Sequence, residues 1–192
     1  MRIVSGIFRG RIIYSPPKHA EIRPTSDMTR ESIFNVVRSK LIGANFLDLF
    51  AGSGAMGLEA LSEGAKLSVF VDKSSLSIAT IRKNIKLLGV ADESIVVKKD
   101  VLQFLEKPYS EIAATKFDLI FIDPPYASKL ASQTLAVLTN SDLMSEGAII
   151  IAEHSSIERL EDTYKGIHSF VCFKRKVYGT IVVNYFEYTK DL

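Results

Sequence analysis

The sequence lacks several features that mark common classes of protein. It contains one cysteine, Cys172, and no tryptophan. A single thiol excludes a disulfide framework and a thiolate metal cluster. The three histidines are scattered and no two have helical metal-ligand spacing, so we expect no metal site. The longest apolar runs, such as residues 148–152, are far shorter than the roughly 20 residues that span a bilayer.

The N-terminus has no basic segment followed by an apolar one, so we expect no signal peptide and a cytoplasmic location. The 192 residues fit one domain, or one domain with a small appendage. Hydrophobic residues make up 47% and charged residues 24%, a composition that favours a folded soluble protein over a disordered one.

Positive charge is concentrated at the start of the chain. Residues 1–40 carry eight basic and three acidic side chains, whereas the remaining residues carry 16 basic and 19 acidic ones. A basic segment on a nearly neutral protein is typical of a phosphate-binding surface. On charge alone, an ordinary solvated face is an equally good interpretation.

From residue 46 onward, apolar runs alternate with helical patterns. The expected strands are residues 46–50, 67–72, 94–97, 117–123 and 148–153, followed by an antiparallel hairpin of residues 168–176 and 180–188. The expected helices are residues 55–63, 74–88, 101–106 and 128–138. Strand–helix alternation predicts a parallel sheet with right-handed crossovers, and continuous apolar strands are typical of burial on both faces. The expected fold class is therefore α/β, with a doubly wound, mostly parallel sheet and antiparallel strands at its C-terminal end.

The first 45 residues follow a different pattern. Residues 1–14 alternate loosely and predict a short β-hairpin that turns near residues 8–11. Two prolines then break the chain, and Ser26 or Asp27 can cap a helix that Gly43 ends. We expect a basic N-terminal extension over residues 1–25 and the main domain over residues 26–192.

A glycine-rich loop follows the first strand of the main domain. Gly52, Gly54 and Gly57 form the G-x-G-x-x-G pattern that binds dinucleotides at the carboxyl edge of such sheets. Asp72 ends the next strand, 20 positions after Gly52, where it could bind a ribose. On these residues alone, a nicotinamide or flavin cofactor remains possible.

Acidic residues at three successive strand ends favour a different ligand. Asp48 would repel a pyrophosphate, but it could accept hydrogen bonds from an ammonium group at the mouth of the site. With Asp72 and Asp100, it would suit a ligand with an ammonium, a ribose and an adenine amino group but no phosphate. S-adenosylmethionine fits this description. Any one of these aspartates could instead be a loop or cap residue.

The motif Asp123-Pro-Pro-Tyr126 ends the fourth strand and faces the same edge. Two prolines fix the backbone and remove two N–H donors. The Asp123 carboxylate and the Pro124 carbonyl could then accept hydrogen bonds from an exocyclic amine and direct its lone pair at a methyl group. Tyr126 could stack on the purine. The alternative interpretation is a rigid turn.

These motifs together resemble the class I S-adenosylmethionine-dependent amino methyltransferases. Residues 2–11, 23–35 and 176–180 are more specific, and they resemble the bacterial family that methylates the N2 amine of guanine 966 in 16S ribosomal RNA. The resemblance implies a seven-stranded, Rossmann-like methyltransferase sheet with S-adenosylmethionine as its cofactor. It also implies that the substrate is 16S rRNA in an assembled or partly assembled small ribosomal subunit. We expect a monomer that needs neither a metal nor a membrane.

Roles for individual residues follow from the same resemblance. It implies cofactor binding by residues at three strand ends: Asp48, Phe50, Gly52, Ser53, Gly54, Asp72, Lys73, Asp100 and Val101. It implies that the guanine is held by Asp123, Pro124, Pro125 and Tyr126. The charge of the N-terminal segment adds five expected RNA contacts: Arg2, Arg9, Arg11, Arg23 and Arg30.

Three other functions remain as alternatives. The Asp-Pro-Pro-Tyr motif does not separate guanine N2 from adenine N6, so a DNA adenine-N6 methyltransferase is the nearest rival. Such enzymes usually need more chain for sequence recognition than residues 1–40 provide. A nicotinamide oxidoreductase would need a Tyr–Lys or His–acid pair, and none is evident. A non-catalytic RNA-binding module would not need the intact motif at Asp123–Tyr126.

Overall fold

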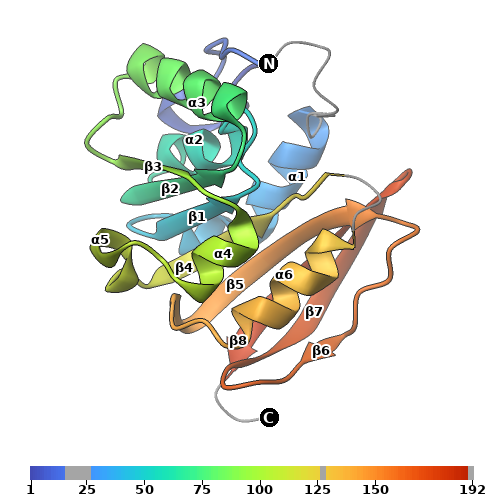
Figure 1. The fold of residues 1–192 in the computed structure, drawn as a ribbon. Helices are drawn as coiled ribbons and strands as arrows, with labels where there is room; N and C mark the ends of the chain where they lie inside the picture. The colour runs from blue at the N-terminus through green and yellow to red at the C-terminus, as the bar shows by residue number, and fades with distance from the viewer. Residues whose placement is uncertain (16–26, 126–128, 190–192) are drawn as a thin grey trace.

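The computed structural model describes residues 1–15, 27–125 and 129–189, and their centre is one sheet with the strand order β3-β2-β1-β4-β5-β8-β7-β6 (Figure 1). The strands are β1 (Asn45–Leu49), β2 (Leu67–Asp72), β3 (Ser94–Lys98), β4 (Phe117–Ile122), β5 (Met144–Ser155), β6 (Thr163–Tyr164), β7 (Ser169–Tyr178) and β8 (Ile181–Thr189). The helices are α1 (Asp27–Val37), α2 (Ala55–Ser62), α3 (Ser75–Leu88), α4 (Val101–Glu106), α5 (Ser110–Ala113) and α6 (Leu130–Leu138). Two 3₁₀ turns complete the set, η1 (Gly6–Phe8) and η2 (Arg38–Lys40).

The pairing of the strands confirms the expected fold class. Strands β1 to β5 pair in parallel, whereas β8 is antiparallel to β5 and to β7. The seven expected strands are all present, and the two-residue strand β6 adds an eighth at the edge. Strand β6 and the four-residue helix α5 are too short to produce a periodic pattern, which is why the sequence did not predict them.

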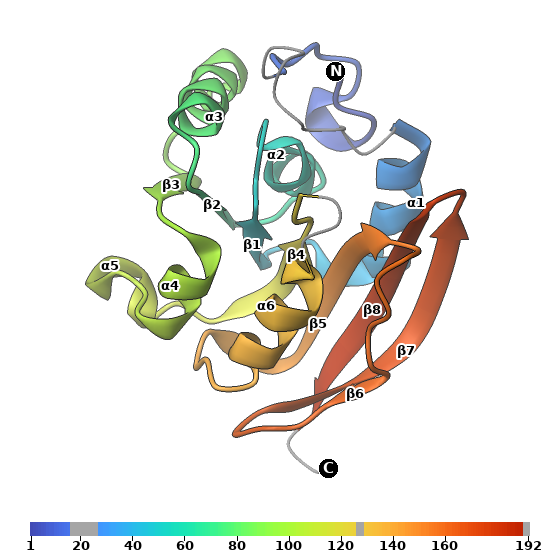
Figure 2. The same cartoon turned by 45° about the vertical axis from the view of Figure 1, so that its right-hand side comes forward.

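Helices cover both faces of the parallel part of the sheet (Figure 2). Residues of α1, α2 and α3 pack in one hydrophobic core, and residues of α4, α5 and α6 pack in the other. In β1, Phe46 belongs to the first core and Leu47 to the second, as the two-residue period of a strand requires. Because the strands are buried on both sides, their carboxyl ends remain as the open edge for a ligand.

Residues 1–15, which we call the N-terminal arm, do reverse direction near the predicted turn, but they do not form a regular β-hairpin. The two halves of the arm pair only briefly: one antiparallel bridge, Arg2 to Ile12, is flanked by backbone hydrogen bonds from Ile3 N–H to the Arg11 carbonyl and from Ile13 N–H to the Met1 carbonyl, and the turn contains η1. The backbone N–H groups of Val4 and Ser5 bond to the Glu59 carboxylate instead of to an opposite strand. The shape of the arm therefore depends both on this short pairing and on its contacts with α2.

Candidate active site

The glycine loop forms a tight turn between β1 and α2. Phe50, Gly52 and Gly54 have φ angles of 61°, 55° and 77°. Left-handed φ is unusual for a phenylalanine, and such strain concentrates at functional sites. A Cβ on Gly54 would also lie 3.1 Å from Cγ1 of Ile81. The loop therefore lies close against α3 at the open edge of the sheet.

Asp48 lies beneath the glycine loop and not at the mouth of the site, so its predicted position was wrong. Its side chain is buried, and Oδ2 accepts a hydrogen bond of 3.0 Å from the backbone N–H of Gly57. Gly57 must lack a side chain because a Cβ would lie 2.3 Å from the ring of Phe70. Burial raises the pKa of Asp48 to about 8, and the nearby charge of Asp72 adds to the shift. In this position Asp48 supports the loop from inside.

The buried carboxyl of Asp48 should make stability depend on pH. Its pKa rises from 3.8 to about 8 on folding, so the folded protein binds more protons than the unfolded chain between these values. Stability should therefore fall as pH rises from 4 to 8, by at most about 1.4 kcal/mol per pH unit. Urea unfolding of Asp48→Asn should lack this contribution. Equal slopes in the variant and the parent would contradict the assignment.

Asp72 ends β2 in a position that fits a ribose-binding role. It is half-buried, and its two carboxylate oxygens accept hydrogen bonds from the backbone N–H groups of Gly52, at 2.9 Å, and Ser74, at 2.8 Å. Each oxygen of a carboxylate has a second lone pair. Asp72 therefore fixes the glycine loop and still has acceptor capacity for two hydroxyl groups.

Asp100 lies at the end of the next strand and caps α4. Its Oδ1 accepts a hydrogen bond of 3.1 Å from the N–H of Leu102, and Lys73 Nζ lies 3.9 Å from its Oδ2. Val101 is the first residue of α4 and is buried. Asp100 is half-buried, so the cap leaves part of its carboxylate open to a ligand.

The proline motif lies beside the glycine loop. Asp123 follows β4, and its backbone N lies 3.5 Å from the carbonyl oxygen of Leu49 in β1. Asp123 is half-buried, Pro124 is buried and Pro125 is exposed, whereas Tyr126 lies outside the described residues. The sequence prediction that the acidic motif and the glycine loop share one edge is therefore confirmed by the β1–β4 pairing.

Sequence reasoning missed Asn84, which links the glycine loop to the N-terminal arm. Its Nδ2 donates to the carbonyl oxygens of Ser53, at 2.9 Å, and Tyr14, at 3.0 Å, while its Oδ1 accepts from the N–H of Tyr14 at 2.7 Å. Asn84 is fully buried. An amide on the apolar face of a helix was the available signal, because a buried amide needs partners.

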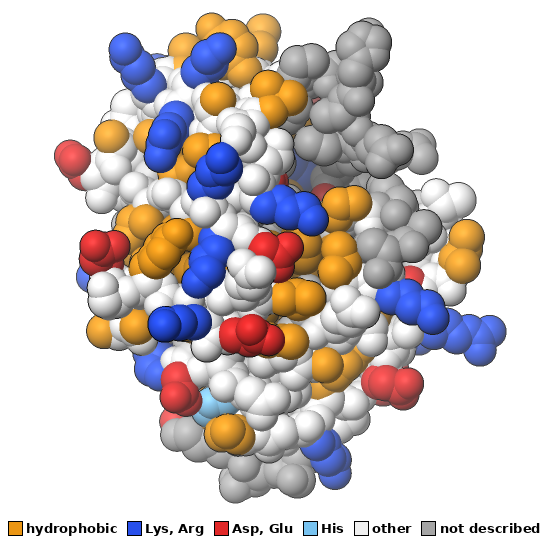
Figure 3. Space-filling view, viewed as in Figure 1, with side chains coloured by type: hydrophobic (Ala, Val, Ile, Leu, Met, Phe, Trp, Pro, Cys, Tyr) orange, Lys and Arg blue, Asp and Glu red, His pale blue; other side chains and the backbone are white. Residues whose placement is uncertain are grey.

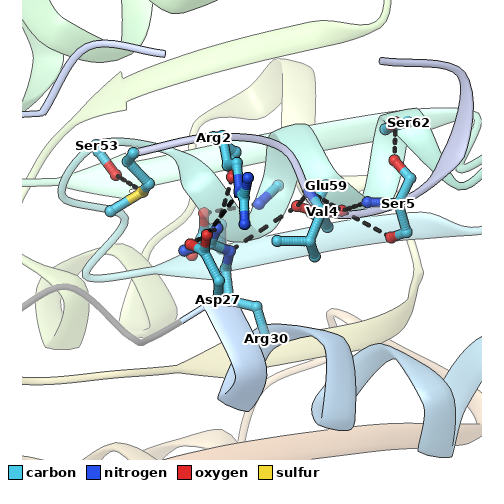
Figure 4. A network of polar contacts seen from close by, with 11 residues as sticks. Arg2, Val4, Ser5, Asp27, Arg30, Ser53, Glu59 and Ser62 are labelled. Carbon is cyan, nitrogen blue, oxygen red and sulfur yellow. Dashed lines mark hydrogen bonds and ion pairs between the residues drawn. The ribbon is translucent and has the colours of Figure 1, made fainter. Parts of the chain in front are cut away.

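It also missed Glu59, a fully buried acid in α2 and the centre of a polar network (Figure 4). Glu59 accepts hydrogen bonds from the N–H groups of Val4 and Ser5 and from the Ser5 hydroxyl, and Nε of Arg30 lies 3.8 Å away. Burial raises the pKa of Glu59, and these donors and Arg30 oppose the shift. The network holds the arm against α1 and α2.

The structure corrects one expected RNA contact and leaves others open. Arg30 is only 1% exposed, and its Nη2 donates to the carbonyl oxygen of Arg2 at 2.6 Å and to Asp27 at 2.8 Å. These bonds direct the guanidinium inward, so Arg30 cannot reach a phosphate in this conformation. Arg2 pairs with Asp27 at 3.0 Å. Arg9 and Arg11 are exposed, and Arg23 lies outside the described residues.

Within the three described ranges, no cluster of three or more His, Cys, Asp and Glu side chains could hold a metal ion. The same ranges contain no helix that is long and apolar enough to cross a membrane.

The open sheet, the glycine loop and the acidic strand ends together define a class I methyltransferase fold. An RNA methyltransferase from Salinibacter ruber, solved with S-adenosyl-L-homocysteine, shares this fold with a TM-score of 0.64 at 14% identity, over 88% of this chain and 96% of that one. A hypothetical protein of Thermus thermophilus is more similar, with a TM-score of 0.78 at 31% identity over 96% and 98% of the two chains.

The chain belongs to the family described as Conserved hypothetical protein 95, whose profile matches residues 1–187. Two curated relatives are both named ribosomal RNA small subunit methyltransferase D. The protein from Haemophilus influenzae is 34% identical over 80% of this chain and 78% of its own length. The protein from Escherichia coli is 33% identical over 80% and 74%. The resemblance inferred from the sequence motifs is thereby confirmed.

Proposed function

We propose that this protein transfers the methyl group of S-adenosylmethionine to the exocyclic N2 amine of guanine 966 in 16S rRNA. One observation carries the proposal: the Asp123-Pro-Pro segment lies at the carboxyl end of β4, directly beside the glycine loop that follows β1. The names of the two relatives support ribosomal RNA of the small subunit as the substrate. The proposed setting is the cytoplasm, where a monomer acts without a metal on an assembled or partly assembled subunit.

The residues at this edge fit S-adenosylmethionine better than a dinucleotide. Asp72 and Asp100 offer carboxylate oxygens to ribose hydroxyls and to an adenine amino group, respectively. The carboxylate of Asp72 already accepts a hydrogen bond from the N–H of Gly52. In a dinucleotide site with this glycine pattern, that N–H points toward a phosphate instead. A carboxylate bonded to the glycine loop would repel a phosphate, whereas a cationic sulfonium ligand is compatible with it.

In the proposed reaction, the protein mainly positions the two reactants. The cofactor supplies a methyl group on a positively charged sulfur, which becomes a neutral thioether when the C–S bond breaks. The Asp123 carboxylate and the Pro124 carbonyl accept hydrogen bonds from the guanine amine and direct its lone pair at the methyl carbon. The new N–C bond forms, and the amine then loses one proton to solvent. Holding both reactants in line supplies most of the rate enhancement.

A methyl-transfer assay tests the proposal directly. Purified protein and radiolabelled cofactor are mixed with small ribosomal subunits from cells that lack this protein, with free 16S rRNA, or with DNA. We expect label in the subunits at N2 of one guanine. Label in DNA as N6-methyladenine would support the rival function. Calorimetry with S-adenosylhomocysteine and with NAD separates a methyltransferase from an oxidoreductase.

Asp72 should control cofactor affinity. We expect Asp72→Ala to raise the dissociation constant of S-adenosylhomocysteine by about 10- to 150-fold, because one or two charge-assisted hydrogen bonds are worth roughly 1.5–3 kcal/mol. Loss of the bond to Gly52 N–H also loosens the glycine loop. Calorimetry on the variant and the parent measures the change. An unchanged affinity would remove Asp72 from the ribose role.

The exposed arginines of the N-terminal arm should contribute to RNA binding. Each phosphate contact adds roughly 0.7–0.9 to the slope of log affinity against log salt. We expect Arg9→Ala/Arg11→Ala to flatten this slope by about one to two units and to leave cofactor affinity unchanged. Binding of small subunits is measured from low to high salt. Equal slopes would show that the arm is an ordinary solvated face.

A further inference from the structure

The outer face of α3 carries positive charge that the site described above does not use. Arg82, Lys83 and Lys86 are exposed, and α3 contains no acidic residue. None of the three forms an ion pair within the part of the chain that the structure describes. Figure 3 shows Lys and Arg side chains gathered over α3 in the upper part of the molecule. Three uncompensated cations on neighbouring turns of one helix favour a polyanionic partner.

An exposed aromatic residue is anchored through its backbone to the same helix. The backbone N–H and carbonyl of Tyr14 both bond to Asn84, which lies between Lys83 and Lys86 in α3. Figure 2 shows the arm and α3 next to each other at the top of the molecule. Tyr14 as a residue is 56% exposed. Because Asn84 is buried and also bonded to Ser53, the backbone of Tyr14 is held in place, and its ring is presented at the surface.

Cations beside an exposed aromatic ring suit one class of partner. Single-stranded RNA binds through phosphates to Lys and Arg, while its unpaired bases stack on aromatic side chains. A protein partner with an acidic surface would account for the cations but would not need the exposed ring.

We infer that Tyr14, Arg82, Lys83 and Lys86, here called the α3 surface, form a docking site for single-stranded ribosomal RNA that flanks the target guanine. The cations bind phosphates and Tyr14 stacks on one unpaired base. This inference rests on the proposed function and assigns part of the substrate to a place on the protein that the active site does not reach. It extends the RNA-binding surface from the arm onto the catalytic domain.

The test compares Lys83→Ala/Lys86→Ala with a matched control, Lys165→Ala/Lys174→Ala. The control removes two exposed lysines from the β6–β7 side of the sheet, so the loss of charge is the same. Binding of small subunits from cells lacking the protein is measured against salt, together with KM, kcat and affinity for S-adenosylhomocysteine. For the α3 variant we expect about tenfold weaker binding at low salt and a slope flatter by about 1.4–1.8. Its KM should rise, whereas kcat and cofactor affinity should not change.

Two outcomes would contradict phosphate binding by Lys83 and Lys86. One is unchanged binding by the α3 variant. The other is an equal loss of binding in the control, which would show that only the net charge of the protein matters. Direct binding is measured in addition to methyl transfer, so that the two proposals fail separately. A parent protein that binds subunits without methylating them contradicts the proposed function, and the effect of Lys83→Ala/Lys86→Ala on that binding still decides whether the α3 surface docks RNA.

Stacking by Tyr14 is tested with Tyr14→Ala and Tyr14→Phe. We expect Tyr14→Ala to weaken subunit binding by about tenfold at every salt concentration, without a change in slope. Tyr14→Phe retains an aromatic ring and should bind like the parent. Both variants keep the backbone bonds to Asn84, and thermal unfolding checks that they remain folded. Parent-like binding by Tyr14→Ala would exclude stacking.

Discussion

Replacing Asp123 with alanine is expected to lower the rate of methyl transfer by roughly 100- to 1000-fold, the range seen when a group that stabilises a transition state is removed. The carboxylate is the charged acceptor of the proposed pair that orients the guanine amine. Asp123 lies at the end of β4, whereas Asp72 and Asp100 lie at the ends of β2 and β3. Cofactor affinity should therefore stay within about tenfold of the parent.

Single-turnover methyl transfer on small subunits measures the rate, and calorimetry with S-adenosylhomocysteine measures cofactor affinity. Asp92→Ala is the control, because Asp92 is an exposed aspartate in the loop between α3 and β3. If Asp123→Ala retains most of the parent's rate while the control is unchanged, Asp123 does not bind the guanine amine as proposed.

Arg30→Ala should destabilise the fold strongly. The substitution removes the hydrogen bonds to Arg2 and Asp27 and leaves the buried carboxylate of Glu59 without its neighbouring charge. Breaking a buried ion pair from one side typically costs about 3–5 kcal/mol. We expect a loss of that size in the free energy of unfolding, measured by urea denaturation.

Arg9→Ala is the matched control, since Arg9 is exposed on the same arm and should leave stability within about 0.5 kcal/mol of the parent. Adding Glu59→Gln to Arg30→Ala should recover part of the loss, because the uncompensated charge is then gone. A change in Arg30→Ala no larger than in Arg9→Ala would contradict the structural role. The assignment of Arg30 to a phosphate would then be open again.

The helix pattern already contained the information that places Arg30 inside. Arg30, Ile33, Phe34 and Val37 are spaced i, i+3, i+4 and i+7, the stripe of one helix face, and all four are buried. The net charge of residues 1–40 carries no information about this spacing. The partner that makes burial tolerable, Glu59, is 29 positions away in the sequence, so no local pattern could identify the pair.

Asp48 shows the same limit in a strand. Phe46 and Asp48 are two positions apart in β1 and therefore point to the same face, which α2 covers. The position of Asp48 near the end of β1 predicted the correct edge of the sheet. The direction of its side chain follows from the two-residue period of the strand, which places it under the glycine loop. Asp72, by contrast, is the last residue of its strand and reaches the edge as predicted.

The order of strands and helices was predictable because burial on both faces leaves a strong apolar pattern. Expected and observed bounds differ by at most one residue at either end for β1, β2, β3 and β4. The full shape of the N-terminal arm was not predictable, because three of its backbone donors, those of Val4, Ser5 and Tyr14, bond to the side chains of Glu59 and Asn84 from helices far along the chain. Such contacts are long-range and leave no periodic signal.

The most direct test of the proposed methylation is to map methylated nucleotides in 16S rRNA from three strains. One strain carries the parent gene, one lacks the gene, and one carries Asp123→Ala. We predict N2-methylguanine at position 966 in the first strain and unmodified guanine in the other two. A methyl group that persists at this position in cells without the protein would contradict the account.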